Sequence, residues 1–174
     1  SHAFQRAFVG LAERRETEHD DFWSWRDRMY DVALRIGPQA LRAVAAHLYS
    51  ELLAGGYTQV CEFHYLHHAP DGSPWPEPAT MSLALADAAA DAGIGLTLLP
   101  TLYERAGFQA DGLRDDQRRF RTTVDEVLAL QRALAARAGP LLNVGAALHS
   151  LRAVRPDSLR RLADAATGPL HIHV

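Results

Sequence analysis

Apolar residues recur at helical spacing in five segments of the chain, each bounded by residues that start or stop helices. Segment 39–54 is the clearest example, because Leu41, Leu48 and Leu52 fall on one stripe and Gly55-Gly56 ends it. The same pattern, with glycine and proline at the boundaries, predicts helices over 20–34, 39–54, 79–92, 120–138 and 156–166. Asp20 or Asp21 is expected to cap the first of them.

Short, mostly apolar runs lie between these helices and predict strands over 57–63, 94–99, 141–148 and 170–174. The runs are apolar on both faces, as buried parallel strands are. Alternating strands and helices predict an α/β fold, either a doubly wound sheet or a (β/α)8 barrel. Neither the glycine-rich dinucleotide fingerprint nor a P-loop is present, which counts against a nucleotide-binding sheet. The polar stretch 100–119 is interpreted as an active-site loop.

Polar residues gather where each predicted strand ends. They are Glu62, His64 and Tyr65, then Pro100, Thr101 and Tyr103, then His149 and Arg152, and finally His171 and His173. In a barrel, the carboxyl ends of the strands form the active-site face. Four such strands make half of a barrel. We therefore expect residues 1–174 to be part of a single catalytic barrel truncated at both ends, an N-terminal-half fragment with about strands one to five.

Histidines make this chain a candidate metal protein. In an extended strand alternate side chains share a face, so His171 and His173 point the same way, as in many transition-metal sites. The adjacent pair His67-His68 cannot share a face in a regular strand. We interpret this pair and His64 as loop or barrel-wall residues rather than a second metal site.

Two further residues of the first predicted strand invite an interpretation. Glu62 interrupts an apolar run, and we expect it to be paired inside the barrel. Cys61 is expected to be a small core residue.

Composition narrows the class of protein. The chain has 174 residues, enough for one domain with a sizeable core. Its net charge of -3 gives no reason to propose a nucleic-acid partner. A single cysteine excludes an internal disulfide framework and suits the reducing cytoplasm. No apolar run has membrane-spanning length, so we expect a cytoplasmic protein without a membrane partner.

Five blocks of sequence resemble one family of metal-dependent amidohydrolases, the formimidoylglutamate deiminases. Ser1 to Ala7 looks like the end of the H-x-H motif on the first barrel strand of that superfamily, and His171-Ile172-His173 resembles its fifth-strand motif. The other blocks, which are specific to the deiminases, are Phe22-Trp23-Ser24-Trp25-Arg26, Cys61 to His68 and His149 to Val154. The resemblance runs along the whole chain.

This resemblance implies a zinc-dependent (β/α)8 barrel of the amidohydrolase type that acts in histidine catabolism. The implied reaction is hydrolysis of N-formimino-L-glutamate to N-formyl-L-glutamate and ammonia. Carried over residue by residue, it implies that His2 and His173 bind one Zn²⁺, with His171 behind them. It also implies a substrate-binding set of Gln5, Arg26, Tyr65, His149 and Arg152. The family's catalytic acid and base residues lie beyond Val174, so none is expected within these residues. Iron or manganese also suits such ligands, and we expect a homodimer.

The charge of the two arginines agrees with that substrate. Formiminoglutamate carries two carboxylates, and arginine binds a carboxylate with a rigid two-pronged fork. Arg26 and Arg152 therefore favour an acyclic dianionic substrate. The alternative within the superfamily is an aminohydrolase that acts on a ring such as guanine or a triazine. A non-catalytic βα domain with structural histidines is the alternative outside it.

Overall fold

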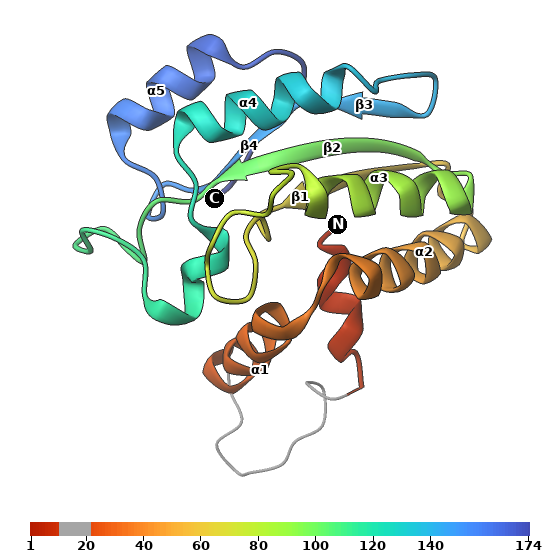
Figure 1. Ribbon diagram of the computed structural model, residues 1–174, viewed down its shortest axis with the longest axis horizontal. Coiled ribbons are helices and arrows are strands. Elements are labelled where there is room, and N and C mark those ends of the chain that lie inside the picture. The colour runs from red at the N-terminus through yellow and green to blue at the C-terminus, as the bar shows by residue number, and fades with distance from the viewer. Residues whose placement is uncertain (11–21) are drawn as a thin grey trace.

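A curved sheet of parallel strands forms the centre of the computed structural model, which describes residues 1–10 and 22–174 (Figure 1). The strands are β1 (Gln59–His64), β2 (Gly95–Leu102), β3 (Leu142–Val144), β4 (Ala146–Ser150) and β5 (Leu170–His173). Their order is β1-β2-β4-β5, with β3 also paired to β2, and every pairing is parallel. Because the order follows the chain without the reversal of a doubly wound sheet, the strands form the arc of a barrel. The predicted parallel half-barrel is confirmed.

The first residue of the chain extends this sheet beyond β1. The Ser1 nitrogen donates to the Cys61 carbonyl oxygen at 2.7 Å. The Phe63 amide donates to the Ser1 carbonyl oxygen at 2.9 Å. These two bonds are the pattern of a parallel bridge. They fix His2 beside the carboxyl end of β1.

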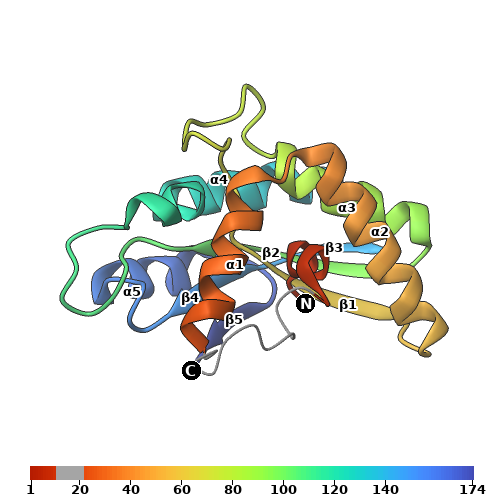
Figure 2. The same cartoon turned by 90° about the horizontal axis from the view of Figure 1, so that it is seen from below.

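The helices lie close to their predicted positions. They are α1 (Phe22–Arg35), α2 (Pro38–Ala54), α3 (Thr80–Ala92), α4 (Val124–Ala135) and α5 (Pro156–Ala165), with 3-10 helices η1 (Ala3–Phe8) and η2 (Asp115–Phe120). Figure 2 shows α3 and α4 along one side of the strands. The predicted caps Asp20 and Asp21 lie outside the described residues.

The helix predicted over 120–138 begins later than expected. The Thr123 hydroxyl accepts from the Glu126 amide, and the Glu126 carboxylate accepts from the Thr123 amide at 2.7 Å. This reciprocal capping box starts α4 at Val124. The residues before it form η2 instead.

Side chains alternate between the two faces of the sheet. On the outer face, Leu102 and Leu148 pack with Val127 of α4 and Leu162 of α5 in an apolar cluster. The inner face carries Phe63 and the strand-end histidines, whose rings lie near one another. Burial of the outer face therefore leaves the inner face for chemistry.

One glycine divides the strand predicted over 141–148 into β3 and β4. The Gly145 amide donates to the Leu98 carbonyl at 3.0 Å. A Cβ at this position would lie 2.1 Å from the Pro169 carbonyl oxygen and 2.7 Å from Leu99 Cδ2. The approach of the chain leading into β5 thus requires a residue without a side chain.

Glu62 is buried and paired, as expected, because its carboxylate accepts from the Ala3 amide at 2.6 Å and from the Tyr49 hydroxyl at 3.2 Å. It lies on the helix side of the sheet, however, and not inside the barrel. The expectation that Cys61 is a core residue is wrong. Cys61 is exposed, because its side chain points to the open inner face. Within the described ranges, no helix has the length and apolar character needed to cross a bilayer.

Candidate active site

All seven residues predicted to bind metal or substrate line one pocket of about 240 Å³. These residues are His2, Gln5, Arg26, Tyr65, His149, Arg152 and His173. The wall is completed by Tyr103, which was expected at the active-site face, and by four residues not assigned to the site from the sequence: Trp25, Met29, Tyr30 and Phe120. The pocket thus joins the start of the chain, α1 and the carboxyl ends of β1, β2, β4 and β5.

The rings of His2 and His173 meet in this pocket. Their centroids are 5.1 Å apart and their planes make an angle of 82°. Two imidazoles that share one tetrahedral zinc ion, with Zn–N bonds of about 2.0–2.1 Å, have ring centroids roughly 5 Å apart. The spacing is therefore compatible with one shared ion.

The protonation state of both rings also suits a metal. His2 Nδ1 lies 3.1 Å from the Phe63 carbonyl oxygen, so Nδ1 carries the hydrogen and Nε2 keeps a lone pair. Burial lowers the pKa of His2 to about 4 and also lowers the pKa of His173. Neutral imidazole is the form that binds zinc. Within residues 1–10 and 22–174, no His, Cys, Asp or Glu extends this pair to a group of three.

Phe63 supports both histidine rings, a role that the sequence analysis missed. The His173 ring stacks on it with centroids 4.0 Å apart, and the His2 ring meets it edge-on at 5.3 Å. His171 contacts the same phenyl ring edge-on at 5.6 Å. His171 and His173 share a face of β5, as alternation predicts, with ring centroids 5.9 Å apart.

Gln5 and Tyr65 form a polar pair on the pocket wall. Gln5 Nε2 donates to the Tyr65 hydroxyl oxygen at 3.1 Å. The tyrosine hydrogen then remains available to a ligand. Burial raises the pKa of Tyr65, so the hydroxyl keeps this hydrogen at neutral pH.

An irregularity of the sheet orients His149. The register between β4 and β5 shifts between Leu148 and Ser150, so His149 is the extra residue of a bulge. Its ring stacks on Tyr103 with centroids 4.0 Å apart. Burial lowers the pKa of His149 to about 3, which keeps the imidazole neutral.

Arg26 and Arg152 reach the pocket from different elements. Arg26 stands on α1, and its guanidinium carbon lies 5.7 Å from the centre of the Tyr30 ring. Arg152 follows β4 in the turn after His149 and is exposed at the rim. Two guanidinium groups on separate elements therefore line the pocket, and that of Arg26 also lies 3.7 Å from the Asp27 carboxylate.

The histidines after β1 belong to the barrel wall, in agreement with the sequence interpretation. His67 Nε2 lies 3.2 Å from the Thr101 carbonyl oxygen, and His68 Nε2 lies 2.7 Å from the Arg121 carbonyl oxygen. Both rings are used to fasten loops rather than to face a common ligand.

A buried arginine that the sequence analysis did not single out holds α1 in place. The Arg119 guanidinium donates to the carbonyls of Ala33 and Ile36 at the end of α1, and to the His68 carbonyl. Cations are favoured at a helix carboxyl end. Arg119 therefore fixes the helix that carries Arg26 into the pocket.

A sequence relative and a solved structure both match the whole of this chain. No protein-family model matches the chain. The chain is 45% identical over 177 residues to formimidoylglutamate deiminase of Pseudomonas aeruginosa, a match that covers 100% of this chain and 39% of that protein. The crystal structure of an amidohydrolase from Brucella melitensis superposes with a TM-score of 0.90 at 44% identity, covering 100% of this chain and 40% of the other. The chain thus spans about two fifths of the length of these relatives.

A more distant likeness concerns the fold alone. Atrazine chlorohydrolase from Arthrobacter aurescens, solved in complex with zinc, superposes with a TM-score of 0.73 at 21% identity. This match covers 99% of the chain and 39% of that structure. The likeness shows a shared fold, and the zinc is a property of that relative.

Proposed function

The whole of this chain is homologous to about two fifths of a formimidoylglutamate deiminase, and it belongs to the amidohydrolase superfamily. We therefore propose that residues 1–174 form part of one catalytic barrel. The reaction is hydrolysis of N-formimino-L-glutamate to N-formyl-L-glutamate and ammonia. The observation that carries this proposal is the convergence of all seven predicted residues on one pocket.

In this proposal His2 and His173 bind one divalent metal ion, and zinc is the ion that we propose. Their ring spacing of 5.1 Å and their lowered pKa values support this role. A bound zinc ion supplies hydroxide at neutral pH by lowering the pKa of water. The remaining ligands and the acid and base residues come from outside residues 1–174.

The chain's own residues bind and orient the substrate. Arg26 and Arg152 neutralise its two carboxylates, since a dianion that enters a partly desolvated pocket without cations costs too much to bury. Neutral His149 and the Tyr65 hydroxyl donate hydrogen bonds without adding charge beside the metal position. Gln5, which donates to Tyr65, orients that hydroxyl.

The cellular location and the oligomeric state are further parts of the proposal. A single cysteine suits a reducing cytoplasm, and we propose that location. We expect the full-length protein to be a homodimer, which its mass in solution tests directly.

The direct experiment measures ammonia release by the full-length protein. The substrates are N-formimino-L-glutamate, guanine and melamine, each with zinc-loaded protein, chelator-treated protein and treated protein given zinc again. We expect ammonia from formiminoglutamate only, lost on chelation and restored by zinc. Release from guanine or melamine alone would favour the ring-aminohydrolase alternative. A zinc-loaded protein inactive on all three substrates would favour the non-catalytic alternative.

A further inference from the structure

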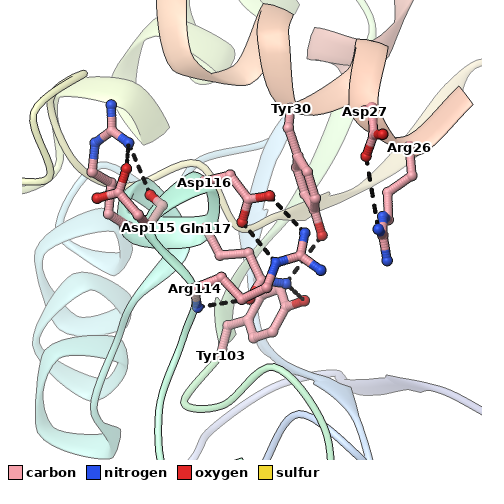
Figure 3. Close-up of polar contacts among 9 residues, drawn as sticks. Arg26, Asp27, Tyr30, Tyr103, Arg114, Asp115, Asp116 and Gln117 are labelled. Carbon is pink, nitrogen blue, oxygen red and sulfur yellow. Dashed lines mark hydrogen bonds and ion pairs between the residues drawn. The ribbon is translucent and has the colours of Figure 1, made fainter. Parts of the chain in front are cut away.

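Gln117 of η2 lies behind the pocket and connects two tyrosines that line it. Its side-chain nitrogen Nε2 lies 3.0 Å from the Tyr30 hydroxyl oxygen and 3.0 Å from the Tyr103 hydroxyl oxygen. Figure 3 shows the amide between the two phenol rings. One side chain therefore links α1 to the carboxyl end of β2.

The orientation of this amide is determined by a third bond. The backbone amide of Arg114 donates to Gln117 Oε1 at 3.2 Å. The other end of the side chain must then be the NH2 group, which donates one hydrogen to each tyrosine. Both phenol oxygens accept from Gln117, so each phenol retains its own hydrogen for another acceptor.

These two hydrogens have no acceptor within the described part of the chain. Tyr30 is 6% exposed, Tyr103 is 4% exposed and Gln117 is 3% exposed, so bulk water is largely excluded. Each hydroxyl already accepts from Gln117, and its own hydrogen can be donated to a second partner. Both tyrosines line the pocket whereas Gln117 does not, and the pocket is therefore where an acceptor is expected.

Two ion pairs lie beside the tyrosines, Arg114 with Asp116 at 2.6 Å and Arg26 with Asp27 at 3.7 Å. The guanidinium carbons of Arg26 and Arg114 lie 5.7 Å and 5.3 Å from the centre of the Tyr30 ring. The Tyr103 ring stacks on His149. Burial raises the pKa of Tyr103, so this phenol remains a donor at neutral pH. Two neighbouring hydroxyl donors that face one pocket match a carboxylate, which accepts up to four hydrogen bonds.

We propose that the hydroxyls of Tyr30 and Tyr103 donate hydrogen bonds to a carboxylate of the substrate, and that Gln117 is the positioning residue that turns both hydroxyls toward the pocket. The inference rests on the proposed function for the identity of the substrate. The recognition of a carboxylate rests on the hydrogen-bond geometry and on the pocket that the two tyrosines line.

Tyrosine-to-phenylalanine variants of the full-length, zinc-loaded protein test the contact. Tyr30→Phe and Tyr103→Phe are compared with Tyr57→Phe, a matched control at a residue 60% exposed outside the pocket. Two quantities are measured: the dissociation constant of glutarate by calorimetry, and KM and kcat for formiminoglutamate. Each pocket variant should raise the glutarate Kd and the KM about tenfold, the usual effect of losing a hydrogen bond to a charged group, while kcat changes less than twofold. The control should leave all three values unchanged.

A double-mutant cycle tests the positioning role of Gln117. Gln117→Met should raise the glutarate Kd like the tyrosine variants, yet add no further loss in the Tyr30→Phe/Tyr103→Phe background. A full additional loss in that background would show that Gln117 does not act through the hydroxyls.

The outcomes separate this inference from the proposed function. Unchanged glutarate Kd and KM in both phenylalanine variants, with ammonia still released by the wild type, would overturn the inference and leave the proposed function standing. A wild type that does not hydrolyse formiminoglutamate, but whose glutarate affinity falls in the variants, would overturn the function and keep the carboxylate site.

Discussion

His2 and His173 stand near opposite ends of the chain, yet their imidazole rings lie 5.1 Å apart. They are brought together by the curvature of the sheet, because His2 lies beside β1 and His173 ends β5, with β2 and β4 between. Phe63 packs beside the pair and contacts both rings. The arc of strands is thus what creates the pair.

This pair leads to a prediction about metal content. In the full-length protein, His173→Ala or His2→Ala should lower zinc affinity by more than the 10- to 100-fold typical of losing an outer partner, because a direct ligand is removed. The bound metal is measured by mass spectrometry after dialysis against a chelator. His47→Ala is the matched control, since the His47 side chain is 66% exposed and pairs with Glu51 on α2. Full zinc occupancy in both site variants would contradict the ligand assignment.

A second prediction concerns the buried guanidinium of Arg119. Arg119→Met removes the donors to Ala33, Ile36 and His68 and leaves buried carbonyls unpaired. We expect the free energy of unfolding to fall by about 3 kcal/mol. Urea denaturation measures the loss. Arg160→Met, at a side chain 72% exposed, should cost less than about 0.5 kcal/mol. Equal effects of the two changes would refute the proposed role in holding α1.

The third prediction is a pH dependence from His67. Burial lowers the pKa of His67 from 6.5 to about 3. Between these values the unfolded chain binds a proton that the folded chain does not, so stability falls as the pH falls. From pH 6.5 to 4.5 the wild type should lose roughly 2 kcal/mol more unfolding free energy than His67→Gln. Glutamine does not titrate in this range and keeps a donor near the Thr101 carbonyl. Parallel curves for the two proteins would show that His67 titrates normally in the fold.

Much of this fold was predictable because its signals are local. Glycine and proline mark helix boundaries at Gly37-Pro38 and Gly55-Gly56. The helix α2 (Pro38–Ala54) begins and ends at these positions. The break at Gly145 was not predictable. Its cause is the carbonyl of Pro169, which is distant in sequence and approaches only in the folded sheet.

The candidate site shows the same division. Residues such as His173 and Arg152 were found through motifs, and they do line the pocket. Tyr30, Gln117 and Arg119 were missed because each acts through partners on other elements. A tyrosine on the apolar face of a helix is also typical of a core residue. Spacing along the chain could not reveal those contacts.

The central claim is that this pocket binds an acyclic dianion between two arginines. The most direct measurement is steady-state ammonia release from N-formimino-L-glutamate by full-length Arg152→Met and Arg26→Met, with metal content determined on the same samples. Each variant should keep its metal and lose about thirtyfold or more in kcat/KM, since an unpaired carboxylate costs roughly 2–5 kcal/mol. Arg152→Lys should recover only part of the activity, because lysine lacks the two-pronged fork. Near-wild-type kcat/KM in both methionine variants would contradict the claim.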